Sequence, residues 1–175
     1  MPIATSDETL SFRGVPIRDI VLRLKSTLPR RYNGTIEFKD SGLATIVNVV
    51  VMRKGRILLM KRSNRVGTYR GKWHSVAGYL DEPVPVRQKM LEELREEIGI
   101  GPRHVESLRL GKPYSFYDRE LGKRWITCLG RADIKTDRIT PDWESVDYRW
   151  VYPGQLKGFD LVPKFGYAVR KAMEL

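Results

Sequence analysis

Cysteine and histidine are scarce in this chain of 175 residues, which contains one cysteine, Cys128, and two histidines, His74 and His104. A single cysteine cannot form an internal disulfide framework, and this usage is typical of a reducing cytoplasm. These three side chains lack the spacing of zinc ligands, so the sequence argues against a zinc site. Cys128 falls in an expected strand and is interpreted as a small buried side chain.

Long apolar runs are also absent. The longest, residues 46–52, is interrupted by Asn48 and is far shorter than the ~20 residues of a membrane-spanning helix. Its β-branched residues predict a buried strand instead. The first eight residues lack the basic start and apolar segment of a secretory signal, so we expect a cytoplasmic protein with no membrane partner.

Acidic residues are outnumbered. The chain has 32 Lys and Arg against 21 Asp and Glu, which gives a formal net charge of +11. This excess favours a polyanionic ligand, either a nucleic acid or a small phosphorylated substrate attracted to a basic cleft. The basic residues are scattered and form no arm with interleaved aromatics, so nucleic acid is the less favoured partner. A solvated basic surface explains the charge equally well.

The hydrophobic pattern divides the chain into an N-terminal extension, residues 1–42, and a main domain, residues 43–175. Apolar residues recur at helical spacing over residues 15–28 and predict an amphipathic helix. The apolar stripe of this helix must pack on the main domain or on a second subunit. A polar connector follows, with a short strand expected at residues 35–39.

The main domain changes to a pattern of strands and helices. The pattern predicts strands at residues 44–52, 56–61, 73–77, 105–117, 124–134 and 145–152, and helices at residues 86–98 and 163–175. This order predicts an α/β (α+β) sandwich in which a mixed sheet lies between helices.

Four glutamates gather within six residues of the helix expected at 86–98, namely Glu92, Glu93, Glu96 and Glu97. Two pairs have i,i+4 spacing, and each such like-charge pair destabilises a helix by roughly 0.2–0.5 kcal/mol. A compensating positive charge is therefore expected. Glu93, Glu96 and Glu97 share one helix face, and oxygen-only ligands suit Mg²⁺ or Mn²⁺ bridging to phosphate. Taken alone, these residues are more typical of a solvated acidic helix face.

The residues around this cluster carry a more specific signal. A predicted strand leads to Gly78, a tight loop follows, and the acidic helix ends at Gly99 and Ile100. The segment 78–100 resembles the signature of the Nudix hydrolases: glycine, five residues, glutamate, seven residues, then Arg-Glu-apolar-x-Glu-Glu-x-Gly-apolar. The spacing is intact, and the resemblance extends over about residues 43–175.

Two positions depart from that signature. Val84 replaces the first glutamate, and Glu92 replaces the arginine, which in the family orients the acidic cluster and can pair with that glutamate. Because both partners change together, no unpaired charge is left by the exchange. We expect Arg87 or Arg95 to neutralise the surplus acid instead.

The resemblance implies hydrolysis of a diphosphate linkage in a nucleoside diphosphate derivative, such as ADP-ribose, a dinucleotide or a nucleoside triphosphate. It implies a Mg²⁺ or Mn²⁺ cofactor held by Glu93, Glu96 and Glu97, with help from the carbonyl of Ala77. It also implies a further metal-binding or catalytic glutamate at Glu144. Either Glu93 or Glu144 would orient the attacking water.

Substrate contacts are expected from basic and aromatic residues. The candidates for phosphate contact are Arg62, Arg70 and Lys72, with a solvated basic loop as the alternative. The candidates for stacking on a base are Trp73, Tyr114, Phe116 and Trp125, although aromatic residues in strands are more often part of the core.

Three functions remain open at this stage. The first is the metal-dependent diphosphatase, the second is a nucleotide-binding or sensing module whose altered signature no longer turns over, and the third is RNA-end processing, which the scattered charge disfavours. The isopentenyl diphosphate isomerases share the fold, but the sequence around Cys128 does not resemble their cysteine motif. A homodimer is one option for the family, with residues 15–28 as its candidate surface.

Overall fold

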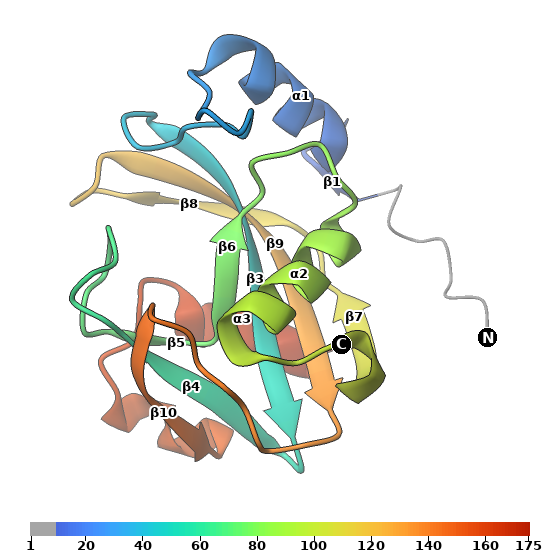
Figure 1. Ribbon diagram of the computed structural model, residues 1–175, viewed down its shortest axis with the longest axis vertical. Coiled ribbons are helices and arrows are strands. Elements are labelled where there is room, and N and C mark those ends of the chain that lie inside the picture. The colour runs from blue at the N-terminus through green and yellow to red at the C-terminus, as the bar shows by residue number, and fades with distance from the viewer. Residues whose placement is uncertain (1–9) are drawn as a thin grey trace.

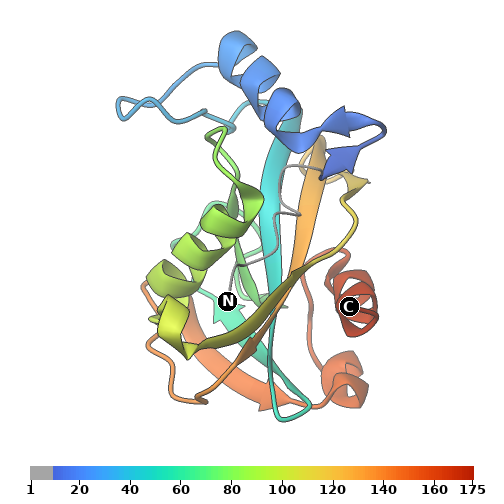
Figure 2. The ribbon, with the colours of Figure 1, turned by 90° about the vertical axis from the view of Figure 1, so that its right-hand side faces the viewer.

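The computed structural model describes residues 10–175 (Figure 1). A mixed sheet forms the centre, with helix α2 (Val86–Ile98) on one face and α3 (Phe165–Met173) on the other (Figure 2). Helix α1 (Ile17–Thr27) lies across one end of the sheet. The predicted sandwich is therefore confirmed. None of the described helices is long and apolar enough to cross a membrane.

Two long strands, β3 (Leu43–Arg53) and β9 (Lys123–Ile134), form the middle of the sheet. They run parallel in a ladder that extends from the Leu43–Arg124 pair to the Met52–Asp133 pair. β3 carries nearly continuous apolar residues, and residues 125–130 of β9 are all buried, which is typical of strands covered on both faces. The other strands of this sheet are built outward from this central pair.

Each central strand carries two shorter strands on its outer edge. On β3, the strand β4 (Arg56–Arg62) pairs only at the hairpin end, and β6 (Val76–Tyr79) pairs with the other half. On β9, β7 (Val105–Leu110) and β8 (Tyr114–Asp118) share the edge in the same way.

Two further strands extend from β4. They are β10 (Ser145–Val151), which lies at the edge of the sheet, and the short β5 (Trp73–His74). Because β4 leaves β3 after two residue pairs, the strands separate beside β6, and the candidate site lies there. Short 3₁₀ helices occupy Pro102–His104 and Pro153–Gly158.

The two faces of the sheet have separate cores because successive side chains of a strand point to opposite sides. On β3, Val47, Val49 and Val51 belong to the core beneath α2, whereas Val50 and Met52 belong to the core beneath α3. Helix α1 adds its buried stripe, Ile17, Val21 and Leu24, to the α2 core. This stripe packs on the main domain, which is one of the two options that the sequence left open for it.

Two predictions for the extension are wrong in detail. The strand β2 (Val15–Pro16) pairs with β1 (Ser11–Phe12), so α1 begins two residues later than expected. Residues 35–39 form no strand, and one isolated bridge joins Arg30 to Ile36. The apolar residues of that segment are buried by packing on the main domain rather than by a sheet.

Predicted boundaries in the main domain also needed correction. The strand expected at 73–77 is divided between β5 and β6, because its two halves pair with different strands. The strand expected at 105–117 is interrupted at residues 111–113, where Pro113 has no N–H to donate. Helix α3 begins at Phe165 because Lys164 adopts a left-handed conformation with φ of 65°.

Candidate active site

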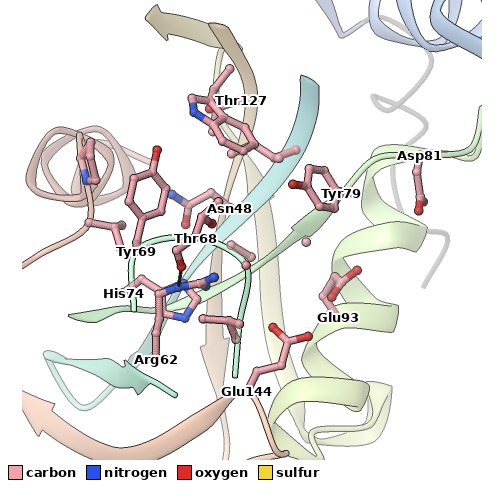
Figure 3. Close-up of a pocket in the computed structure, with 18 of the residues that line it drawn as sticks. Asn48, Arg62, Thr68, Tyr69, His74, Tyr79, Asp81, Glu93, Thr127 and Glu144 are labelled. Atoms are coloured by element: carbon pink, nitrogen blue, oxygen red, sulfur yellow. Dashed lines mark hydrogen bonds between the residues drawn. The ribbon is translucent and has the colours of Figure 1, made fainter. Parts of the chain in front are cut away.

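A cavity of about 430 Å³ lies beside β6, between α2 and the loops that follow β4 and precede β10 (Figure 3). Carboxylates and cations line the end near α2, and aromatic rings line the end near β8 and β9. The divergence of β4 from β3 therefore creates a pocket with one charged and one aromatic part.

The geometry of α2 presents the glutamates in two ways. Glu93 and Glu97 are buried, with 8% and 4% of their surface exposed, whereas Glu96 is exposed and lines the cavity. The helix ends at Gly99, whose φ of 70° gives the left-handed cap that the sequence predicted. The N–H of Ile100 donates to the carbonyl of Leu94, which completes the cap.

Gly78 makes room for the carboxylate of Glu93. A Cβ atom at this position would lie 2.2 Å from the Glu93 carboxyl carbon, far inside the distance that real Cβ atoms tolerate. The glycine that opens the signature is thus required by a side chain fifteen residues later on the facing helix. The same contact fixes where Glu93 can lie.

Glu97 is bonded to the end of β6, where the Ala77 N–H donates to Glu97 Oε1 at 3.2 Å. Burial raises the pKa of the Glu97 carboxyl well above its usual range, and the negative charges of Glu93 and Glu144 raise it further. Ala77 itself lines the cavity. Its predicted role, a carbonyl ligand, stays a prediction.

Glu144 reaches the same end of the cavity from the loop before β10 (Figure 3). Two backbone contacts hold this residue: the Ser63 N–H donates to its carbonyl at 2.7 Å, and its own N–H donates to Asp142 Oδ1 at 2.9 Å. Burial and the charge of Asp142 raise the pKa of the Glu144 carboxyl, while Arg62 opposes that increase.

The donor set fits a hard divalent cation. Burial raises the pKa values of Glu93, Glu97 and Glu144, so the ionised forms lack stabilisation that an oxygen-seeking cation would supply. Among residues 10–175, however, no three His, Cys, Asp or Glu side chains already surround a common point. Glu93 faces Lys89, and Glu97 is bonded to Ala77. The carboxylates therefore lie near one another, but their oxygens do not point at a common ion position.

Both departures from the signature have local explanations. Val84 is partly buried and packs against the apolar core beneath α2. Glu92 lies toward solvent, where it accepts a hydrogen bond from Gln88 Nε2 at 2.9 Å. Neither side chain therefore leaves an uncompensated charge in the interior.

The cation that lies against Glu93 is Lys89, whereas compensation by Arg87 or Arg95 stays a prediction. Arg87 donates to the carbonyl of Leu108 at 2.7 Å, and Arg95 is exposed. Lys89 instead places its Nζ 2.9 Å from Glu93 Oε1. The i,i+4 spacing of Lys89 and Glu93 was a signal in the sequence that could have identified this pair.

Of the four candidates Arg62, Arg70, Lys72 and Trp73, only Arg62 lines the cavity, and its Nε donates to the Thr68 carbonyl at 2.9 Å. The other three lie outside the lining. Arg70 donates to the Val66 carbonyl, Lys72 pairs with Asp160 at 2.7 Å, and Trp73 packs edge-on against Phe159. Those contacts are local to the loop and to the α3 core, which no spacing rule in the sequence reveals.

The aromatic end of the cavity includes three of the predicted stacking residues, Tyr114, Phe116 and Trp125. Trp125 stacks with Tyr79 at a centroid distance of 6.2 Å and an interplanar angle of 25°. Tyr79, which the sequence reasoning missed, stacks in turn on Phe38 of the extension at 5.3 Å. The rings form a continuous wall.

Buried polar atoms interrupt this aromatic wall. Asn48 Oδ1, Thr127 Oγ1 and Trp125 Nε1 all belong to cavity-lining residues, and within the described residues none of these atoms has a hydrogen bond of regular geometry. The Tyr114 hydroxyl interacts with Asn48 and Thr127 (both labelled in Figure 3), and the Tyr69 hydroxyl interacts with Trp125. Asn48 was noticed only as an interruption of the apolar run 46–52, which was the available signal. Buried polar atoms without a regular hydrogen bond are rare, so a ligand that donates and accepts hydrogen bonds is favoured here.

Comparison with known proteins agrees with this geometry. Residues 42–172 match the model of the NUDIX domain. The chain belongs to the Nudix hydrolase family. A search of curated proteins found no match.

Several solved structures share the fold. The NUDIX domain of NrtR from Shewanella oneidensis, in complex with ADP ribose, is 18% identical with a TM-score of 0.64 and covers 75% of this chain and 87% of that one. A MutT protein from Methanosarcina mazei Go1 is 22% identical, with a TM-score of 0.63 and coverage of 77% and 96%. An Ap4A hydrolase from C. elegans is 17% identical, with a TM-score of 0.60 and coverage of 75% and 96%. At these identities the similarity establishes the Nudix fold.

Proposed function

We propose that this Nudix protein hydrolyses a diphosphate linkage in a nucleoside diphosphate derivative, with Mg²⁺ or Mn²⁺ as cofactor. One observation carries the proposal: Glu93, Glu96 and Glu144 line one cavity, and Glu97 accepts a hydrogen bond from Ala77, which lines the same cavity. Carboxylates so placed suit a cation that bridges protein and diphosphate.

The cavity suits the two chemical parts of such a substrate. Its volume, about 430 Å³, is ordinary for a small-molecule site. Arg62 lines the charged part and is the proposed phosphate contact, while Tyr79 and Trp125 border the part proposed for the base. Asn48 Oδ1 and Trp125 Nε1 supply an acceptor and a donor for its edge. The ADP ribose and Ap4A named for two relatives are of this substrate class.

The proposed reaction is the attack of water on one phosphorus. The water oxygen forms a new P–O bond, the bond from that phosphorus to the bridging oxygen breaks, and each product keeps a phosphate. Glu93, Glu96 and Glu97 would hold the cation, which when bound would supply charge stabilisation for the diphosphate oxygens. We assign the water and its proton to Glu144, because Glu93 is engaged by Lys89 and Glu97 by Ala77.

A substrate panel tests this proposal. The wild-type protein is incubated with nucleoside diphosphate derivatives and Mg²⁺ or Mn²⁺, and the products are identified by mass. The proposal expects two phosphate-bearing fragments from at least one compound. Glu144→Gln should lower kcat with that compound by about a hundredfold, as removal of a general base does. Unchanged turnover by this variant would reject the role of Glu144.

A second candidate function is a nucleotide-binding or sensing module. The observation that favours it is the altered signature, in which Val84 belongs to the core and Glu92 faces solvent. This alternative expects nucleotide binding in calorimetry but no new phosphate-bearing product after prolonged incubation with either metal. Detection of both fragments from a bound nucleotide would exclude it.

A further inference from the structure

Lys89 occupies an unusual position for a lysine in this molecule. Its side chain is 17% exposed and lies between two carboxylates, with Nζ 2.9 Å from Glu93 Oε1 and 3.9 Å from Asp81 Oδ1. A largely buried ammonium requires such partners, because its burial without them is strongly unfavourable. Lys89 also lines the cavity, so it stands beside the proposed reaction site rather than on the far surface of α2.

The charges continue beyond Asp81 into the N-terminal extension. Asp81 is 8% exposed, and its second oxygen lies 3.7 Å from Arg31 Nη1. Arg31 is itself paired with Glu37 at 3.3 Å, and the Ile36 N–H donates to the Asp81 carbonyl at 3.1 Å. The extension therefore holds Asp81 in place by both side chain and backbone.

The Asp81–Lys89 pair has the same spacing as the glutamate–arginine pair of the Nudix signature, which Val84 and Glu92 replace in this chain. Asp81 and Lys89 are eight residues apart, as are Val84 and Glu92, and both positions are shifted three residues toward the N-terminus. Three residues are close to one helical turn, so Lys89 keeps the helix face that carries Glu93. The charge that position 92 lacks is present one turn earlier.

We propose that Lys89, held by Asp81, is the positioning residue of Glu93. It binds one carboxylate oxygen of Glu93 and keeps the side chain in the space that Gly78 leaves open, so that the second oxygen remains available. The proposal rests on the proposed function, since a position for Glu93 matters only if this carboxylate is used. Arg31 supports the arrangement by holding Asp81.

The test compares Lys89→Met with Lys89→Arg and with Lys171→Met, which removes an exposed lysine that forms an equivalent pair with Glu174 on α3. Lys89→Met should lower kcat about tenfold, the usual effect of losing a residue that orients a metal ligand, with little change in KM. Lys89→Arg should restore most of that loss, and Lys171→Met should behave as wild type.

A second measurement needs no turnover. Calorimetric titration with Mn²⁺ alone should show binding to Lys89→Met that is about tenfold weaker than to wild type, because Glu93 is no longer held in place, and Lys89→Arg should bind Mn²⁺ nearly as wild type does. Mn²⁺ binding that is equally weak in Lys89→Met and Lys89→Arg, together with a lower Tm in both, would overturn the proposal and indicate a purely structural role. So would wild-type kcat in Lys89→Met.

The two proposals fail differently. If the wild-type protein hydrolyses nothing in the panel, the proposed function fails, while the Mn²⁺ titrations still decide whether Lys89 controls Glu93. A further variant, Asp81→Asn, removes the charge that holds Lys89 without touching α2. It should lower kcat about two- to threefold, less than Lys89→Met, because Glu93 remains paired. If Asp81→Asn lowered kcat more than Lys89→Met does, the proposal that Asp81 acts through Lys89 would be contradicted.

Discussion

Helices α2 and α3 cover opposite faces of one sheet, yet they bury different chemistry. The buried residues of α3 are all apolar: Phe165, Ala168, Val169 and Ala172. Helix α2 buries an apolar stripe of similar size and, beside it, Glu93 and Glu97. Buried carboxylates oppose folding unless a partner compensates them. The buried residues of α3 can therefore serve stability alone, whereas the buried carboxylates of α2 reduce stability and are the groups proposed to carry the chemistry.

The largest effect is expected on the face of the sheet that α2 covers, where the buried carboxylates lie. Glu97→Gln should lower kcat/KM about a thousandfold, since it removes a charge from the proposed metal site, and the metal-free variant should unfold at the same or a higher temperature than wild type. Steady-state kinetics and thermal melts in a chelator check both parts. Glu92→Gln, on the solvent side of the same helix, is the matched control and should change neither. Near-normal turnover by Glu97→Gln would reject the assignment of Glu97 to the metal site.

The next effect is expected on the face of the sheet that α3 covers. Phe165 is 1% exposed in the α3 core, and Phe165→Ala should lower the free energy of unfolding by about 3–5 kcal/mol. Because α3 contributes no charged group to the cavity, the folded fraction of this variant should keep the wild-type kcat. Urea unfolding and activity at low temperature measure the two quantities. A variant that is stable but inactive would show that the faces are not independent.

A smaller effect tests the contact between β6 and α2. Gly78→Ala would place a methyl group within 2.2 Å of the Glu93 carboxyl carbon, so that side chain must move. We expect kcat to fall about tenfold to a hundredfold, with a modest loss of stability. Gly67→Ala, at a position in the cavity loop with open space around its Cβ, is the control. Equal activities of the two variants would mean that the position of Glu93 is unimportant.

The smallest effect concerns His74, which lines the cavity and is buried. Burial, with a contribution from Arg62, lowers the pKa of His74 to about 3. The unfolded chain therefore binds a proton below about pH 6.5 that the folded chain does not bind, and stability falls with decreasing pH in that window. His74→Leu should remove this dependence.

The expected difference is measurable by urea unfolding at two pH values. Between pH 7 and pH 5, wild type should lose about 2 kcal/mol more than His74→Leu, since each pH unit below 6.5 corresponds to about 1.4 kcal/mol. Above pH 7 the histidine is neutral in both states and should contribute no slope. Parallel losses in the two proteins would show that His74 takes up its proton in the folded state.

The sequence predicted the sandwich and the acidic helix because both rest on local periodicity. Residues 86–98 form a helix capped at Gly99, as expected. The sequence-based prediction was wrong where pairing between distant segments determines the ends of a strand. Residues 105–117 look like one strand, but β9 is long enough to pair with both halves separately.

The candidate site was predictable only in part. The glutamates of α2 follow from spacing in one helix, whereas Arg31 and Tyr79 depend on how the extension packs against β6. Arg70 and Lys72 were favoured for their charge, but the conformation of their loop directs them to local partners. Charge along the sequence does not give the direction of a side chain in a loop.

The central claim is that the carboxylates at the charged end of the cavity support attack of water on a diphosphate. The most direct measurement is hydrolysis in ¹⁸O-labelled water by the wild-type protein with Mg²⁺ or Mn²⁺, followed by mass analysis of both fragments. We expect one labelled oxygen in one of two phosphate-bearing products, formed about a thousandfold more slowly by Glu97→Gln. Nucleotide binding without any labelled product, under conditions in which Mn²⁺ binds, would contradict it.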